Sequence, residues 1–152
     1  MRRSERKILP EAEGQATVEF LLSTLFIMIT IFWSLEIVMF IYSYSVLADA
    51  AKEGVRYAVV HGSQSSSPSG PGTGTTSDCA TSVTSVKSVV QNYAKLTLHD
   101  ISNMTVTVCY LDGNNQSPNR VQIRVSYPYK PYFSLGWSPP TIKAAAEGRV
   151  FY

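Results

Sequence analysis

The feature that most constrains this chain is an apolar run over residues 20–47, in which Glu36 is the single charged residue. A helix of about 20 apolar residues crosses the hydrocarbon core of a bilayer. Because the run is longer than that, we expect a helix over residues 15–61 that crosses a membrane and continues beyond it as a stalk. Trp33, Tyr42 and Tyr44 are residue types found near membrane interfaces.

The segment before the run indicates the orientation of this helix. It carries Arg2, Arg3, Arg6 and Lys7, and basic residues beside a membrane helix mark its cytoplasmic side. We therefore expect a single-pass protein with a cytoplasmic N-terminus and an extracytoplasmic C-terminal part. The net charge of +2 gives no case for a nucleic-acid partner.

The segment after the stalk divides into a linker and a small head. Residues 62–77 contain only Gly, Ser, Pro, Thr and Gln, so they cannot bury an apolar face. We expect a flexible linker over residues 62–78 and a head over residues 79–152. With the long helix before it, the head makes the fold class α+β.

Hydrophobic periodicity predicts the elements of the head. Residues 82–96 have apolar residues at intervals of three and four, as in an amphipathic helix. Residues 104–111 and 121–127 alternate apolar and polar residues on either side of a turn, which predicts an antiparallel hairpin. Residues 141–152 are a candidate third strand, although three successive alanines at 144–146 are poor strand composition.

Two cysteines, Cys79 and Cys109, lie in the head. Extracytoplasmic compartments permit disulfides, so we predict one bridge, with two free buried thiols as the alternative. His61 and His99 are isolated from other metal-ligating residues, which argues against a metal site. Asp100 beside His99 has no nucleophile motif, and we expect neither catalysis nor a cofactor or small-molecule substrate.

Two surfaces are open to more than one interpretation. Leu47, Ala51, Val55 and Ala58 form one apolar face of the stalk, which we expect to pack on the chain's own head rather than on another subunit. Residues 127–140 combine five aromatic residues with four prolines. Such a loop serves either as a contact surface for a partner or as a lid over the core.

The junction at Gly14 reverses the order of an ordinary secretory signal, because the small residue precedes the apolar run. Cleavage after Gly14 would remove a polar leader, residues 1–14, and leave Gln15 as the N-terminus of an intact membrane helix. This arrangement resembles the type IV prepilin signal, and within that superfamily the TadE-like pseudopilins of tight-adherence pili. The resemblance rests on the motif Gly14-Gln15-Ala16-Thr17-Val18-Glu19-Phe20, on Glu36, and on the segment Ala48-Asp49-Ala50-Ala51-Lys52-Glu53-Gly54-Val55-Arg56.

The resemblance implies a bacterial minor pseudopilin of the cytoplasmic membrane, cleaved by a prepilin peptidase between Gly14 and Gln15. Its helix would pack against other pilin-like subunits, with contacts at Glu19, Phe20 and Glu36. The alternative for Glu19 is a position in water at the cytoplasmic interface, and for Glu36 a position at the outer interface, where its carboxylate reaches headgroup water. The carboxylate of Glu19 could pair with the amine of a neighbouring subunit, which would offset the cost of burying both charges. The alternative is an uncleaved, single-pass accessory module of an envelope or secretion complex.

Overall fold

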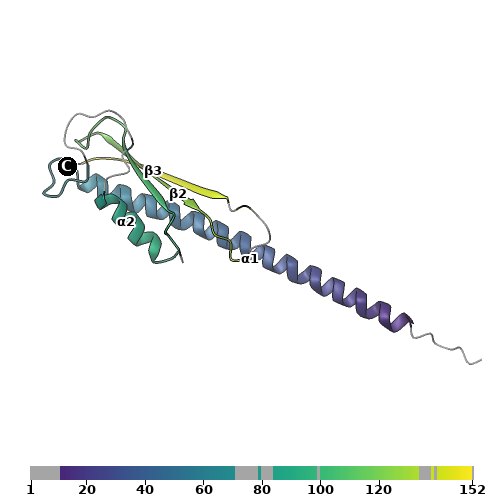
Figure 1. Cartoon of the computed structure of the whole chain (residues 1–152). Coiled ribbons are helices and arrows are strands. Elements are labelled where there is room, and N and C mark those ends of the chain that lie inside the picture. The colour runs from purple at the N-terminus through teal and green to yellow at the C-terminus, as the bar shows by residue number, and fades with distance from the viewer. Residues whose placement is uncertain are drawn as a thin grey trace, which may run out of the picture. The chain divides into compact units, whose positions relative to one another are not determined.

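The computed structural model describes residues 11–70, 79, 84–98, 100–133, 138 and 140–151, with side chains from residue 14 onward. Figure 1 shows the elements in chain order, which are helix α1 (Glu11–Val60), helix α2 (Thr84–Lys95) and strands β1 (Thr105–Tyr110), β2 (Arg120–Pro128) and β3 (Thr141–Arg149). The predicted fold class is confirmed. The chain combines a long N-terminal helix, one further helix and a short antiparallel sheet.

The chain divides into two compact units, and the boundary between Val38 and Met39 falls inside α1. In the first unit, Met1–Val38, the described residues belong to the first part of α1. The second unit, Met39–Tyr152, is called the folded unit below. It contains the rest of α1, helix α2 and the sheet. The stalk is therefore packed with the head, whereas the sequence suggested a division near residue 61.

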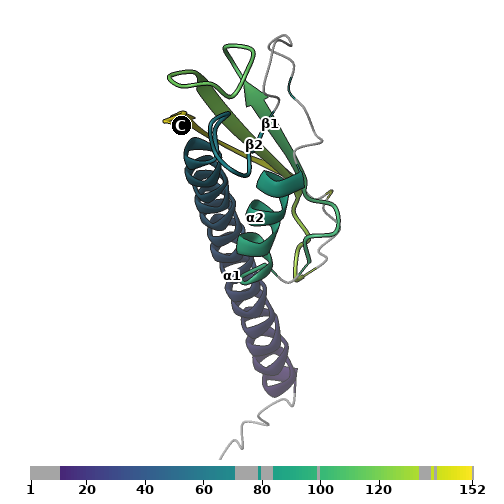
Figure 2. The same cartoon turned by 90° about the vertical axis from the view of Figure 1, so that its left-hand side faces the viewer.

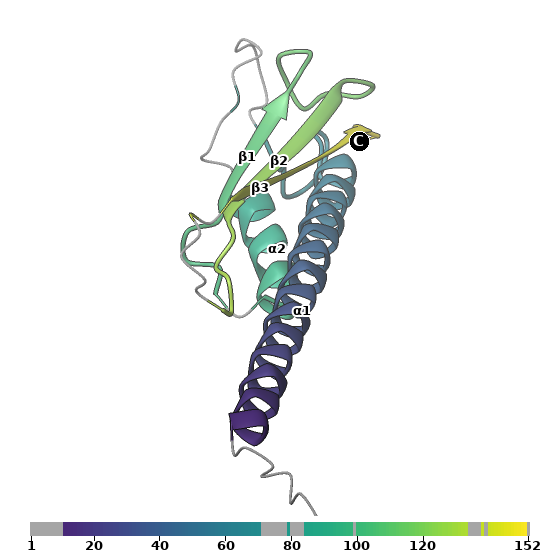
Figure 3. The same cartoon turned by 90° about the vertical axis from the view of Figure 1, so that its right-hand side faces the viewer.

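The sheet of the folded unit is an antiparallel meander with the strand order β1-β2-β3, shown in Figure 3. Ile123 of β2 is the partner of Val108 on β1 and of Ala146 on β3. The candidate third strand is present despite its alanines. Ile142 and Ala144 of β3 are buried, so small side chains at this edge still contribute to the core.

Both helices lie on the same face of the sheet, as Figure 2 shows for the C-terminal part of α1 and for α2. The four residues of the predicted apolar stalk face are all buried in the folded unit, namely Leu47, Ala51, Val55 and Ala58. The expectation that this face packs on the chain's own head is confirmed. Burial of such a face is the main stabilising contribution to a helix of this kind.

The disulfide lies outside this helix-covered core. Alternation along β1 directs Val108 and Tyr110 inward and therefore turns Cys109 toward the opposite face of the sheet. There Cys109 is bonded to Cys79, with a Cα–Cα distance of 4.1 Å. The predicted bridge is thus present, and it ties the segment before α2 to an edge strand.

The first part of the predicted flexible linker is packed against the head, contrary to expectation. Ser69 is 1% exposed, and its backbone N–H donates to the carbonyl of His61 at 2.7 Å. The backbone N–H of Ser63 donates to the carbonyl of Asn115 at 3.0 Å. Hydrogen bonding to distant backbone groups holds residues 62–70 in place without apolar side chains. Residues 71–78 lie outside the described part.

Candidate membrane-anchoring and assembly helix

The first part of α1 presents a continuous apolar surface. The large apolar residues between Val18 and Ile41 are 38% to 72% exposed, except for the half-buried Phe40. A helix that is apolar on all sides is stable only when it is buried in protein or in a membrane. The helix is long and apolar enough to cross a bilayer, and its most apolar window is not buried within the chain. It is the one such helix among the described residues.

Two hydroxyl groups in the apolar part of this helix donate to its own backbone. Thr30 Oγ1 donates to the carbonyl of Phe26 at 2.9 Å, and Ser34 Oγ donates to that of Ile31 at 2.8 Å. Hydroxyls bonded in this way need no water. They are therefore compatible with lipid or with a neighbouring helix.

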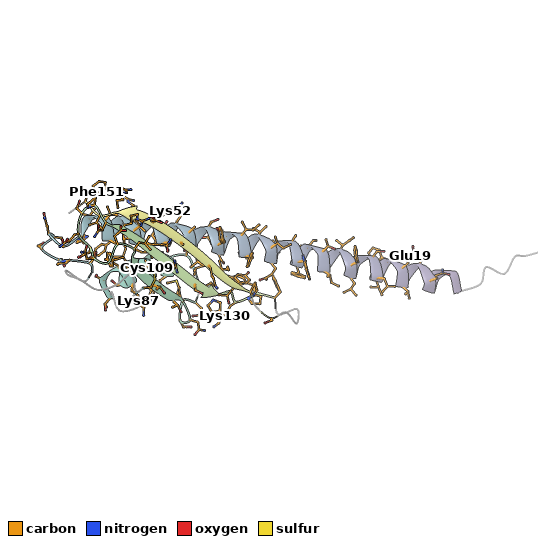
Figure 4. All side chains as sticks on the ribbon, turned by 90° about the horizontal axis from the view of Figure 1, so that it is seen from above. Glu19, Lys52, Lys87, Cys109, Lys130 and Phe151 are labelled. Carbon is orange, nitrogen blue, oxygen red and sulfur yellow. A yellow bond between two sulfur atoms is a disulfide. The ribbon has the colours of Figure 1, made fainter. Side chains whose placement is uncertain are left out.

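Three of the sequence-predicted site residues lie together at the start of the helix. Gly14, Gln15 and Glu19 line one shallow, open depression together with Val18, Leu22 and Ser23. Figure 4 shows Glu19 among the outward-directed side chains of this part of α1. Gln15 and Glu19, four residues apart, are thus on one helix face, and Gly14 lies at the edge of the same depression.

The other two predicted contact residues lie elsewhere on the helix. Phe20 is exposed, but its position directly after Glu19 turns it about 100° around the axis. Glu36 is half-buried and lies about 25 Å farther along the helix than Glu19. The structure therefore gives these residues separate faces rather than one common patch.

Gly14 has no packing role in the described fold. A Cβ added there would meet no atom within 4 Å. Glycine inside a helix is less favourable than alanine by about 0.5–1 kcal/mol. The described fold therefore gives no reason for glycine at this position.

Two ion pairs fix connections of the folded unit. Arg120 at the start of β2 donates to Asp112 from Nε at 3.2 Å, from Nη2 at 3.0 Å and from its backbone N–H at 2.8 Å. These hydrogen bonds, the side-chain ones first, hold the pKa of Asp112 below its ordinary value. Hydrogen bonds from Lys130 and from the backbone N–H of Ser102 likewise lower the pKa of Asp100. His99, the neighbour of Asp100 considered above, lies outside the described residues.

Sequence reasoning missed a buried polar cluster beneath residues 62–70. The hydroxyl of Tyr110 donates to the carbonyl of Ser69 at 2.9 Å. Asn115 is fully buried and donates from Nδ2 to the carbonyl of Gly70 at 3.3 Å. The pKa of Tyr110 is raised because burial disfavours the phenolate. No short motif marks these residues, because they come from two segments that are 41 to 45 residues apart in sequence.

The described residues contain no group of three or more His, Cys, Asp and Glu side chains that could hold a metal ion. The described residues thus define a long helix able to span a membrane, followed by a small α+β unit. Residues 14–56 match the family model described as TadE-like protein. The identification made from the motifs is thereby confirmed for this segment. Neither the curated proteins nor the solved structures contain a significant match to the chain.

Proposed function

We propose that this protein is a minor pseudopilin of the TadE-like kind, anchored in the bacterial cytoplasmic membrane, that acts in assembly of a tight-adherence pilus. The observation that carries the proposal is the TadE-like match over residues 14–56, because it covers the junction, the apolar helix and the first turns of the stalk. The exposed apolar surface of that helix supports it further.

The proposed mechanism is helix packing rather than chemistry. A prepilin peptidase cleaves between Gly14 and Gln15, and the trimmed helix stays in the membrane with its N-terminus on the cytoplasmic side. Pilin-like subunits then pack on the face that holds Gln15 and Glu19. An amine of one subunit near the Glu19 carboxylate of its neighbour offsets the burial of both charges.

Complementation of a deletion strain tests the proposal. Cells without this chain should lose tight-adherence pili in electron micrographs, and the wild-type chain should restore them. The variants Gly14→Phe and Glu19→Ala should fail to restore pili although they accumulate in membranes. Glu53→Ala is the matched control on the stalk, where the Glu53 side chain is 41% exposed and forms an ion pair with Arg56 at 3.2 Å.

The uncleaved accessory module predicts a different result. Such a protein would work with its leader in place, so Gly14→Phe would behave like the wild type. Normal pili in the deletion strain would contradict the proposed function.

A further inference from the structure

A contact between Phe40 and Tyr129 marks one end of the folded unit. The two rings meet edge to face with their centroids 5.3 Å apart. Tyr129 follows β2, and its backbone N–H donates to the carbonyl of Pro140, just before β3, at 3.1 Å. The connection between β2 and β3 therefore begins and ends beside the first turn of α1 in the folded unit.

Exposed apolar and basic side chains gather at this end. Tyr132 is 56% exposed and Phe133 is 38% exposed. Lys130 forms an ion pair with Asp100, and Asp100 lines an open depression together with Leu96, which is 83% exposed. Figure 4 shows Lys130 and Phe151 toward opposite ends of the folded unit. We call Leu96, Lys130, Tyr132 and Phe133 the rim.

The length of the apolar helix places this end near a membrane surface. About 20 helical residues cross the hydrocarbon core, so a span that begins at Phe20 ends near Met39. Phe40 already contacts the head, and Ser43 is the first buried residue of α1 in the described chain. Less than about one helical turn, roughly 5 Å, then separates the end of the span from the folded unit.

We propose that the rim rests in the phospholipid headgroup region of the bilayer, on the side where the folded unit lies. This inference rests on the membrane anchoring in the proposed function. Tyrosine is enriched at the level of the headgroups. Lysine can place its stem along apolar surface while its ammonium stays in water.

Phospholipid fits this surface better than a second protein does. The membrane-spanning helix itself places the bilayer next to the rim. The apolar surface of α1 extends to Ile41, and the rim begins beside Phe40. Among the described residues, the depression beside the rim is open rather than enclosed, which gives an anchoring side chain of a protein partner little to grip. For residues 127–140 the sequence left two roles open, a contact surface for a partner or a lid over the core. On this proposal, Lys130, Tyr132 and Phe133 contact the membrane. The inner residues Tyr127 and Tyr129 instead close the core.

Tryptophan fluorescence of the full chain in phosphatidylcholine vesicles tests the proposal. Trp33 and Trp137 are the two natural tryptophans. Replacing both with Phe gives a background for single reporters at Tyr132→Trp and, on another segment, at Leu96→Trp. Phe151→Trp is the control, since Phe151 is 74% exposed and lies at the opposite end. A Trp137→Phe chain that keeps Trp33 reports on the span itself.

We expect vesicles with bromine near the lipid headgroup to quench both rim reporters strongly and to shift their emission to the blue. The Phe151→Trp reporter should be neither quenched nor shifted. A different result would contradict the proposed contact between the rim and the headgroups: the rim reporters behave like Phe151→Trp, while Trp33 is quenched by bromine at mid-chain. That result would leave the proposed membrane anchoring intact. If the Phe151→Trp reporter is quenched as strongly as the rim reporters, the proposed contact between the rim and the headgroups is also contradicted. If Trp33 itself is not quenched, the helix does not span the bilayer. In that case both the proposed function and the proposed headgroup contact of the rim are wrong.

Discussion

Gly54 of α1 lies against Val90 of α2 so closely that a Cβ on the glycine would come within 2.5 Å of Val90 Cγ2. The same Cβ would come within 2.9 Å of Ile123 Cδ1 on the central strand. Helices α1 and α2 and strand β2 therefore meet at Gly54. A second close approach joins the edge strand to the helix, where a Cβ on Gly148 would lie 2.5 Å from Val55 Cγ1.

Substitution of Gly54 by alanine should destabilise the folded unit. Overpacking a core costs about 1–3 kcal/mol, and the better helix propensity of alanine offsets about 0.5–1 kcal/mol of that. We expect Gly54→Ala to lower the free energy of unfolding by about 1–2 kcal/mol. Urea unfolding of the full chain in detergent micelles, followed by near-ultraviolet circular dichroism, measures the change.

A paired variant checks the cause. Adding Val90→Ala removes the methyl group that the new Cβ would strike, so the double variant should lose less stability than the two single losses added together. If the losses of stability in the two single variants simply add in the double variant, the close approach of Gly54 and Val90 does not cause the destabilisation. Glu53→Ala, on the same turn and with a side chain that is 41% exposed, should stay within about 0.5 kcal/mol of the wild type.

Removing the Tyr110 hydroxyl should loosen residues 62–70. Tyr110→Phe leaves the buried carbonyl of Ser69 without this donor, and such a loss costs about 1–3 kcal/mol. Amide hydrogen exchange in residues 62–70 should accelerate, whereas Tyr93→Phe on the exposed side of α2 should leave it unchanged. Unchanged exchange in Tyr110→Phe would mean that the hydrogen bond does not hold this segment.

Acid should weaken the folded unit through Asp112 and Asp100. Both carboxyls have a folded-state pKa below the ordinary value of 3.8. Such groups add stability that is fully present above the unfolded-state pKa and is lost as the pH falls through the folded-state pKa. We therefore expect the urea midpoint to fall as the pH drops below about 4.

Replacing single aspartates with asparagine shows which carboxyl group causes the loss of stability in acid. Asp112→Asn should be less stable than the wild type at neutral pH and should lose less further stability in acid. Asp49→Asn, in an exposed pair with Lys52, is the control and should keep the wild-type acid profile. An Asp112→Asn profile parallel to that of the wild type would show that this pair is not responsible.

Reduction of the disulfide should destabilise the folded unit. The bridge closes a loop with a sequence separation of 30 residues, for which loop-closure entropy gives about 3–4 kcal/mol. Dithiothreitol and the double variant Cys79→Ala, Cys109→Ala should lower the urea midpoint by similar amounts. Alkylation of both cysteines in native, unreduced protein would contradict the pairing.

Local pattern predicted most of the fold. Three- and four-residue spacing predicted α2 over residues 82–96, and the structure describes it as Thr84–Lys95. Alternation predicted the hairpin, and apolar spacing predicted the buried face of the stalk. These features were accessible because each depends on residues that are close together in sequence.

Contacts between residues far apart in the sequence could not be predicted from local patterns. The alanines of β3 argued against a strand, yet the strand forms because small residues such as Gly148 let α1 approach the sheet. The anchoring of Ser69 by Tyr110 depends on a contact across 41 residues. The contact between Phe40 and Tyr129 likewise joins distant parts of the sequence. Glycine and serine in residues 62–70 resembled a flexible linker, because composition does not reveal backbone hydrogen bonds to distant partners.

Mass spectrometry of the N-terminus, on protein from membranes of cells with and without prepilin peptidase, tests the central claim most directly. A Gly14→Phe chain in peptidase-positive cells is the control, and the open space at Gly14 means that this change should not disturb the described fold. We predict a protein that begins at Gln15, in its free or cyclised form, only in wild-type chain from cells that have the peptidase. The same leader-bearing N-terminus in all three samples would contradict the account.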